Sequence, residues 1–221
     1  MMMENVCDGE SKMKFYDCST APSPRRVRMF IAEKGIDIET VDVDLGSKEQ
    51  MLPEFRKINP NCTVPVLLLE NGTCYTSTAG IRNYLEALHP TPSLMGENAE
   101  ERGRVADIQW RIEMDGLMAM SEALRNSAPR MSGRALTGTF DYEQIPELAE
   151  RGKLRVERFL AGIDELIGDN PFAAGKYFSI ADIDLLVVID FAKWIKLGLP
   201  EDAKNARRWY SNVSQRESAK L

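Results

Sequence analysis

The sequence predicts an α/β domain with a small mixed sheet, followed by an all-α helical bundle. Short β-rich runs alternate with amphipathic runs over residues 13–88. The strand signals then stop, and residues 98–221 contain only long helical patterns. Between the two, residues 89–97 (HPTPSLMGE) carry the prolines and glycine of a linker. Residues 1–12 form a polar leader before the first expected strand.

Elements of the first half follow the order β-α-β-α-β-β-α. The first predicted helix has prolines at its start and Gly35 just past its end, which is typical of helix boundaries. Apolar and acidic residues alternate over residues 38–45, as in a half-buried strand. The pair Asn71 and Gly72 is a hairpin signal, and Pro53 interrupts the short second helix. The predicted strands are residues 13–18, 38–45, 64–70 and 73–76, and the predicted helices are residues 22–34, 47–58 and 77–89.

The third predicted helix presents Ile81, Leu85 and Leu88 on one apolar face. Ser77 and Thr78 precede that pattern and are the candidates for its N-cap. We expect the apolar face to pack against the core.

Four helical patterns fill the second half. Ser179 and Asp182 have the S-x-x-D spacing of a capping box, with Asp in place of the usual Glu. The run that follows them is apolar on nearly all sides, so it predicts the buried central helix of this half. The predicted helices are residues 99–126, 146–168, 179–198 and 205–216.

Composition excludes several classes of function. The chain has 221 residues, 43% of them hydrophobic, which is enough for one large core or two modest ones. The net charge is −6 and no long basic run occurs, so we expect no nucleic-acid partner. No apolar stretch reaches about 18 residues, and the start lacks the basic and apolar regions of a secretory signal. We therefore expect a cytoplasmic protein that does not bind membranes.

The cysteines and the single histidine do not form a metal or disulfide pattern. The four cysteines include no Cys-x-x-Cys pair, so we expect free thiols. His89 is followed by a proline at an expected helix end. Zinc sites and histidine-based triads need clustered partners, so we expect no metal cofactor. The cysteines are Cys7, Cys18, Cys62 and Cys74.

Three stretches resemble motifs of the cytosolic glutathione S-transferase family, in which a thioredoxin-like domain precedes an all-α domain. Residues 58–67 (INPNCTVPVL) resemble the family's Asn-Pro-x-x-x-Val-Pro-x-Leu stretch. Residues 77–86 (STAGIRNYLE) are similar to its Glu-Ser-x-Ala-Ile-x-x-Tyr-Leu motif, and residues 178–186 (FSIADIDLL) match its capping box and hydrophobic staple. The resemblance is to a bacterial branch, extends from Met13 to Lys220, and implies glutathione as co-substrate.

The resemblance implies how the peptide part of glutathione binds. In the family the bond corresponding to Val64–Pro65 is cis, and the backbone of Val64 pairs with the cysteinyl unit like an added strand. The glutamyl carboxylate lies at a helix N-terminus, here at Ser77 and Thr78, where unpaired N–H groups favour an anion. Thr78 has the alternative role of capping its own helix. Ser77 stands where the family has Glu, which leaves the partner of the glutamyl amine open.

For the glycyl carboxylate, many relatives place His, Gln or Lys shortly before the Val-Pro pair. Asn61 and Cys62 hold those positions here, with Lys57 upstream. Lys48 and Gln50 lie in the preceding segment. We expect a lysine or an amide of this set to meet the carboxylate, with Cys62 and Lys57 as candidates for the binding site.

The family stabilises the glutathione thiolate with a Tyr, Ser or Cys in the turn before the first helix. Ala21 falls on the usual hydroxyl position and cannot donate. The candidate donors are Ser23, Thr20 and Ser19, in that order, with Tyr16 as an outside choice. Ser23 ranks first because an Asn two places after the usual position contacts the sulfur in a similar bacterial branch. Its alternative role is the N-cap of the helix.

Cys18 raises a separate possibility, because family members with a catalytic Cys exchange thiols and disulfides. It lies three residues before the reactive position, on or just past the first strand. A thiol there gains less from a helix dipole than one at the helix N-terminus. We therefore expect Cys18 to be structural.

The family binds its second substrate between the domains, against the first long helix of the helical half. Here that helix carries Trp110, Met114 and Met118, which would form an adaptable apolar wall. Helical spacing is also typical of plain core packing. The polar residues 122–146 contain arginines that could reach a ligand or a dimer partner. The resemblance implies a homodimer.

The sequence thus predicts a glutathione-dependent enzyme. It would conjugate glutathione to small electrophiles, or use it to reduce peroxides or disulfides. The alternative is a non-catalytic binding or adaptor protein of the same fold, which Ala21 and Ser77 favour because both depart from the family pattern.

Overall fold

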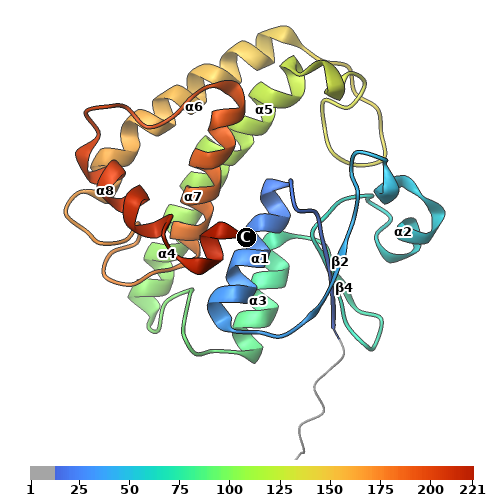
Figure 1. Cartoon of the computed structure of the whole chain (residues 1–221), viewed down its shortest axis with the longest axis horizontal. Helices are drawn as coiled ribbons and strands as arrows, with labels where there is room; N and C mark the ends of the chain where they lie inside the picture. Colours follow the sequence, from blue (N-terminus) through green and yellow to red (C-terminus); the bar gives the residue numbers. More distant parts are fainter. Residues whose placement is uncertain (1–12) are drawn as a thin grey trace, which may run out of the picture.

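The computed structural model describes residues 13–221, so the expected leader at residues 1–12 lies outside the described residues. Figure 1 shows a small sheet with flanking helices and, beside it, a larger group of helices. The first part has the element order β-α-β-α-β-β-α, and the second is all-α. The predicted fold class is confirmed.

The sheet consists of β1 (Lys14–Asp17), β2 (Glu39–Asp42), β3 (Val66–Leu68) and β4 (Cys74–Tyr75). The spatial order is β2-β1-β3-β4. β1 pairs parallel with β2 and antiparallel with β3, and β3 pairs antiparallel with β4. Gly72 adopts φ 84° in the predicted hairpin, where the Leu69 N–H donates to the carbonyl of Thr73 at 2.9 Å.

Three helices accompany the sheet: α1 (Pro22–Lys34), α2 (Pro53–Ile58) and α3 (Thr78–Leu88). α1 and α3 lie between the sheet and the helical part, and α2 lies on the other side (Figure 1). α1 ends as predicted, with Gly35 in the left-handed conformation at φ 63°. The helical stretch predicted over residues 47–58 is interrupted at Pro53, as expected: a 3₁₀ turn ends at Met51, Leu52 is extended, and Pro53 begins α2, where its missing N–H costs nothing. Leu88 is 48% exposed because it lies in the last turn of α3, past the buried stripe of Ile81 and Leu85.

The all-α part contains α4 (Ala99–Arg111), a π-helical turn η2 (Ile112–Leu117), α5 (Met118–Ser127), α6 (Pro146–Ile167), α7 (Ile180–Ala192) and α8 (Lys204–Val213). The single helix predicted over residues 99–126 is thus interrupted by the π-helical turn. Beside this turn the Met114 carbonyl accepts a hydrogen bond from Arg155 Nη2 at 2.7 Å. None of the helices in the described range is long and apolar enough to cross a membrane. The short 3₁₀ segments are η1 (Glu49–Met51), η3 (Pro129–Met131), η4 (Lys193–Ile195) and η5 (Glu217–Lys220).

α7 is the buried centre of the helical part, as predicted, since every residue from Ile180 to Ile189 is buried. Ser179 and Asp182 form the predicted capping box. One oxygen of Asp182 also accepts from the Trp209 indole N–H, at 2.8 Å. Burial raises the pKa of Asp182, and the hydrogen bonds that it accepts only partly oppose this.

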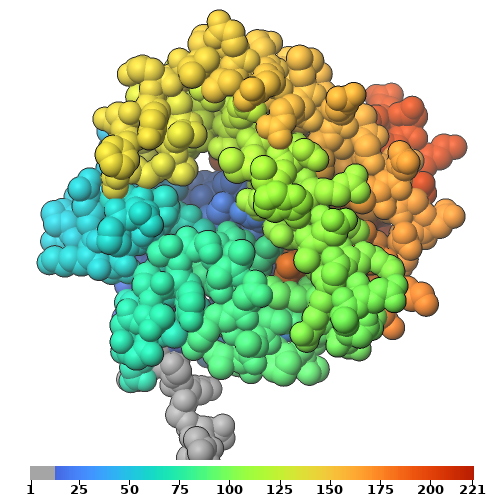
Figure 2. Space-filling view, turned by 180° about the vertical axis from the view of Figure 1, so that it is seen from behind, coloured from blue at the N-terminus to red at the C-terminus, as the bar shows by residue number. Residues whose placement is uncertain are grey.

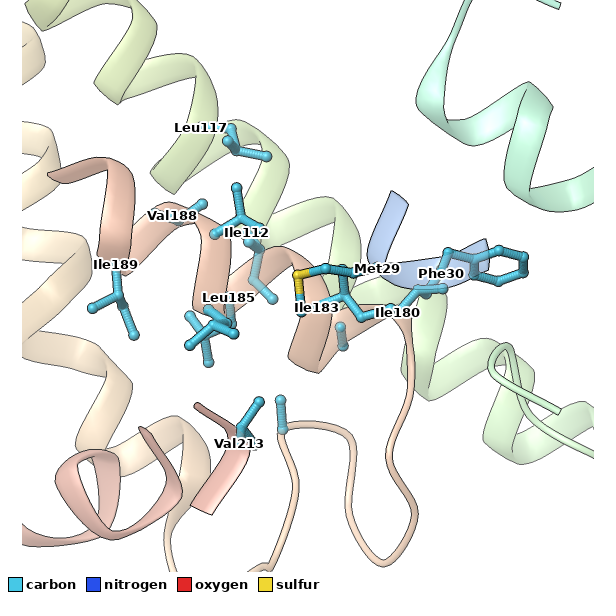
Figure 3. Packing of buried hydrophobic residues seen from close by; sticks show 14 of the residues in the cluster. Met29, Phe30, Ile112, Leu117, Ile180, Ile183, Leu185, Val188, Ile189 and Val213 are labelled. Carbon is cyan, nitrogen blue, oxygen red and sulfur yellow. The ribbon is translucent and has the colours of Figure 1, made fainter. Parts of the chain in front are cut away.

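The core continues from α7 into α1. Figure 3 shows Met29 and Phe30 of α1 beside Ile180 and Ile183 of α7. These side chains belong to one buried hydrophobic cluster that spans both parts of the chain. The helix that follows the first strand is therefore held by the helical part as well as by the sheet.

Candidate functional site

The start of α1 carries few backbone donors. Ala21 is the N-cap, with extended backbone (φ −93°, ψ 135°), and no side chain caps the helix. Pro22 and Pro24 have no N–H, so Ser23 holds the only backbone N–H among the first three helical residues. It is not paired with another backbone group in the described chain. This N–H and the positive end of the helix dipole can together stabilise a bound anion.

Ser23 does not cap α1, so its alternative role in the sequence analysis was wrong. Its Oγ instead accepts a hydrogen bond from Arg26 Nη2, one turn later, at 3.2 Å. A serine hydroxyl has two acceptor lone pairs and one proton, so it can accept here and still donate elsewhere. Arg26 is 4% exposed, so its guanidinium is a fixed neighbour of the hydroxyl.

The other candidates for the donor lie around this turn. Ser19 and Thr20 are exposed, and Thr20 Oγ1 lies 3.6 Å from the Sγ of the buried Cys18. Tyr16 is turned toward α2, where its ring meets the ring of Phe55 edge-on at 6.0 Å. The structure therefore brings Ser19, Thr20 and Ser23 to the start of α1 and leaves Tyr16 away from it.

The loop before β3 presents unpaired backbone groups. The Val64–Pro65 peptide bond is cis, and within residues 13–221 the N–H and C=O of Val64 pair with no other backbone group. The fully buried Asn59 holds the loop, because its Nδ2 donates to the carbonyl of Thr63 at 2.8 Å. Asn59 is a positioning residue that the sequence analysis missed. Its only signal was its place in the Asn-Pro motif.

Cys62 lies in the same loop with a left-handed backbone, φ 55°, and is 4% exposed. Its Sγ faces the carbonyl of Pro60 at 3.7 Å, so the thiol points into the protein. Lys57 is exposed in the last turn of α2, and Gln50 is 2% exposed with an unpartnered Oε1. The structure thus leaves Lys57, but not the side chains of Cys62 or Gln50, open to a ligand.

α3 begins at a second anion-accepting end. Ser77 is its N-cap, and its Oγ accepts from the N–H of Gly80 at 3.0 Å. Thr78 is the first helical residue rather than the cap, which corrects its alternative role. The N–H groups of Thr78 and Ala79 make no backbone hydrogen bond in the described chain, as expected for a first turn.

A buried ion network fixes both helix starts to α7. Asp184 is fully buried and accepts from Arg82 of α3 through both oxygens, at 2.6 and 3.0 Å. Arg26 of α1 lies 3.7 Å from the same carboxylate and 2.5 Å from Glu113. Burial alone would raise the pKa of Asp184, but the charges of Arg82 and Arg26 outweigh it and lower that pKa. α1 and α3 are thereby tied to one buried group.

A small pocket of about 60 Å³ lies beside the start of α1. Phe191 and Trp194 form its aromatic wall, with ring centroids 5.3 Å apart in a T-shaped contact. Its remaining lining residues are Thr20, Ala21, Pro22, Arg25, Val187 and Asp190. Trp110, Met114 and Met118 do not line this pocket. Trp110 is 60% and Met118 is 50% exposed on α4 and α5.

Comparison with known proteins identifies the class to which this fold and site belong. Residues 20–88 match the glutathione S-transferase N-terminal domain, and residues 120–217 match the glutathione S-transferase C-terminal domain. Glutathione S-transferase 2 of Saccharomyces cerevisiae is 32% identical over 216 residues, which cover 96% of this chain and 89% of that protein. The chain belongs to the glutathione S-transferase family.

Solved structures that resemble this chain belong to the same family. The crystal structure of Gtt2 from Saccharomyces cerevisiae is 31% identical, with a TM-score of 0.84 over 94% of this chain and 98% of that one. A glutathione S-transferase domain-containing protein of Marinobacter aquaeolei is 30% identical, with a TM-score of 0.85 over 93% of this chain and 99% of that one. The chain is thus a glutathione transferase whose catalysis depends on glutathione, as the sequence predicted.

Proposed function

We propose that this enzyme holds the glutathione thiolate at the N-terminus of α1, with Ser23 as the hydrogen-bond donor, and adds it to small electrophiles. One observation carries the proposal: Arg26 already donates to Ser23 Oγ at 3.2 Å. The hydroxyl therefore keeps its own proton for a further acceptor. A thiolate in front of the helix is such an acceptor.

The proposed chemistry begins with deprotonation. A free thiol of this kind has a pKa of about 8.5, so it is mostly protonated in neutral water. The hydroxyl and N–H of Ser23 and the positive end of α1 stabilise the charged form and lower that pKa. The thiol loses its proton to solvent, and the thiolate sulfur attacks the electrophilic carbon. A carbon–sulfur bond forms, and the leaving group departs with its electron pair.

Three further contacts are proposed for the peptide part of glutathione. The unpaired N–H and C=O of Val64, next to Pro65, pair with the cysteinyl backbone. The free N–H groups at the start of α3, at Thr78, hold the glutamyl carboxylate while Ser77 caps the helix. The exposed charge of Lys57 meets the glycyl carboxylate.

For the electrophile we propose the pocket beside Ala21. Support comes from its aromatic wall of Phe191 and Trp194 and from its position next to the start of α1. The proposal replaces the wall expected at Trp110, Met114 and Met118, since the first and last of these are at least half exposed.

We also propose a cytoplasmic homodimer. A second copy would cover the exposed large apolar side chains of Trp110 and Met118. A cleft of about 320 Å³ between α4 and α6 offers it a recess. The free thiols of the described cysteines, Cys18, Cys62 and Cys74, suit a reducing compartment.

Activity of Ser23→Ala beside Ser19→Ala tests the proposed site. With 1-chloro-2,4-dinitrobenzene, we expect Ser23→Ala to lower kcat/KM at least about tenfold, because a hydrogen bond to a charged group contributes about 1.5–3 kcal/mol. Ser19→Ala, the matched serine in the same turn, should stay near wild type. Equal activity of the two variants would remove Ser23 from the mechanism. Wild-type reduction of a mixed disulfide without any conjugation would make the enzyme a reductase.

A further inference from the structure

The segment from α5 to the start of α6 carries three arginines without acidic partners. In the described chain no carboxylate lies within 4.0 Å of Arg125, Arg130 or Arg134. Nearby, Arg151 and Arg155 both pair with Glu122, and Arg155 also lies 3.8 Å from Asp115. The three arginines thus lack such ion pairs in a chain with a net charge of −6.

Arg125 is a partly buried cation that has main-chain and sulfur acceptors but no carboxylate among the described residues. Arg125 Nη2 donates to the carbonyl of Leu136 at 3.0 Å, but its Nε is buried without a partner. Burial and the charge of Arg134 lower the pKa of Arg125. Two like charges held together in partial burial cost stability unless an anion joins them.

Arg130 places a cation beside the pocket at the start of α1. Its guanidinium lies over the ring of Trp194, 5.3 Å from the centroid, and that ring lines the pocket together with Thr20 and Ala21. A ligand that rests against Trp194 therefore meets a cation at the edge of the pocket.

The same segment crosses from the helical part toward the sheet part. A Cβ placed on Gly138 would lie 3.8 Å from the carbonyl oxygen of Asn61, in the loop before β3. Figure 2 shows residues around 130–145 (yellow) against the α2 region (cyan), with a hollow below them where α1 (blue) is visible. The three arginines thus lie on the segment of residues 125–145, which crosses over the hollow near the start of α1.

We propose that Arg130 binds the carboxylate of an anionic aromatic electrophile whose ring rests against Phe191 and Trp194, and that Arg125 and Arg134 of the same segment add to the positive charge that the carboxylate meets. This proposal deepens the proposed function and rests on it. Guanidinium groups match the planar, two-oxygen geometry of a carboxylate, and the aromatic wall matches a planar ring. The glycyl carboxylate of glutathione has the same chemistry, so the experiment separates these two sources.

Two substrates that differ by one carboxylate test the proposal: 2-chloro-1,3-dinitrobenzene and 4-chloro-3,5-dinitrobenzoate. Each kcat/KM is divided by the uncatalysed rate constant of its substrate. We expect the wild type to favour the benzoate, Arg130→Gln to lower this preference about tenfold or more, and Arg134→Gln to lower it by a smaller factor. Arg102→Gln, an exposed arginine that donates to the Gly96 carbonyl, is the charge-matched control and should not change it.

Other outcomes count against the proposal. An unchanged preference in both variants overturns it, while conjugation of the neutral substrate would still uphold the proposed function. A rise in the KM of glutathione that is equal with both substrates would assign the arginines to the glycyl carboxylate instead.

If neither substrate is conjugated, the proposed function fails and direct binding decides the inference. Calorimetry with unreactive 3,5-dinitrobenzoate should then give about tenfold weaker binding to Arg130→Gln than to wild type. Equal affinities would overturn the assignment of the arginines.

Discussion

Replacing Asp184 by Asn should destabilise the whole fold, because the change leaves the buried Arg82 without an ion pair in the described chain and removes one of the two carboxylates beside the buried Arg26. Asp184 is fully buried and bonded to Arg82 at 2.6 and 3.0 Å, and Arg26 lies 3.7 Å away. Removing one partner of such a buried pair costs about 3–5 kcal/mol of unfolding free energy. For a chain of this size, that corresponds to a fall in Tm of roughly 10 °C.

Urea unfolding followed by far-ultraviolet circular dichroism measures this loss. The midpoint should fall while the slope m stays constant, since the same surface is exposed on unfolding. Glu39→Gln is the control, because it breaks the Lys14–Glu39 pair, which lies on the surface. We expect no measurable change there. A loss below about 1 kcal/mol for Asp184→Asn would refute the view that this carboxylate fastens α1 and α3 to α7.

The sign of the pH dependence follows from the same network. Burial would raise the pKa of Asp184, but the two arginines lower it below the unfolded value of about 3.9. Its contribution to stability is therefore complete above about pH 4 and is lost as the pH falls through the folded pKa. Asp184→Asn should flatten this acid limb, whereas an unchanged limb would assign it to other carboxylates.

Three further predictions address packing, the C-terminal contact and assembly. Gly152→Ala should lower Tm, because the new Cβ would lie 2.5 Å from the backbone nitrogen of Ala123. Overpacking of this kind costs about 1–3 kcal/mol of unfolding free energy. An unchanged melting curve would contradict the close approach of α5 and α6. Burial alone would raise the pKa of Glu33, but hydrogen bonds from Arg216 and Ser218 outweigh burial, and the pKa is lowered. The stability that Glu33 contributes is therefore lost as the pH falls below the unfolded value of about 4.3. Glu33→Gln should weaken this acid dependence in thermal melts, and a variant as acid-sensitive as wild type would show that the contact is not used. Sedimentation should give twice 24.9 kDa at micromolar concentration, and a mass near 24.9 kDa would exclude the homodimer.

Local signals in the sequence predicted the architecture well. The capping box at Ser179 and Asp182, the terminating Gly35 and the hairpin glycine Gly72 all act within a few residues, so they can be recognised without knowledge of the fold. The burial of α7 was predictable because a helix that is apolar on every side has no face for water.

Contacts between distant segments could not be predicted in the same way. Arg26, Arg82 and Asp184 look like ordinary polar positions of three helices, and only the packing of those helices makes them one network. Trp194 was missed for the same reason, since it joins Ala21 in a pocket across more than 170 positions of sequence.

The most direct test of the proposed mechanism is the pKa of the thiol of bound glutathione. Thiolate absorbance in the ultraviolet, titrated against pH at saturating glutathione, gives this pKa for wild type, Ser23→Ala and Ser19→Ala. A hydrogen bond to a charged sulfur contributes about 1.5–3 kcal/mol, so Ser23→Ala should raise the pKa by about 1 to 2 and Ser19→Ala should leave it in place. A curve for Ser23→Ala that coincides with wild type would contradict the account. If Thr20→Ala then raised the pKa, the donor would be Thr20.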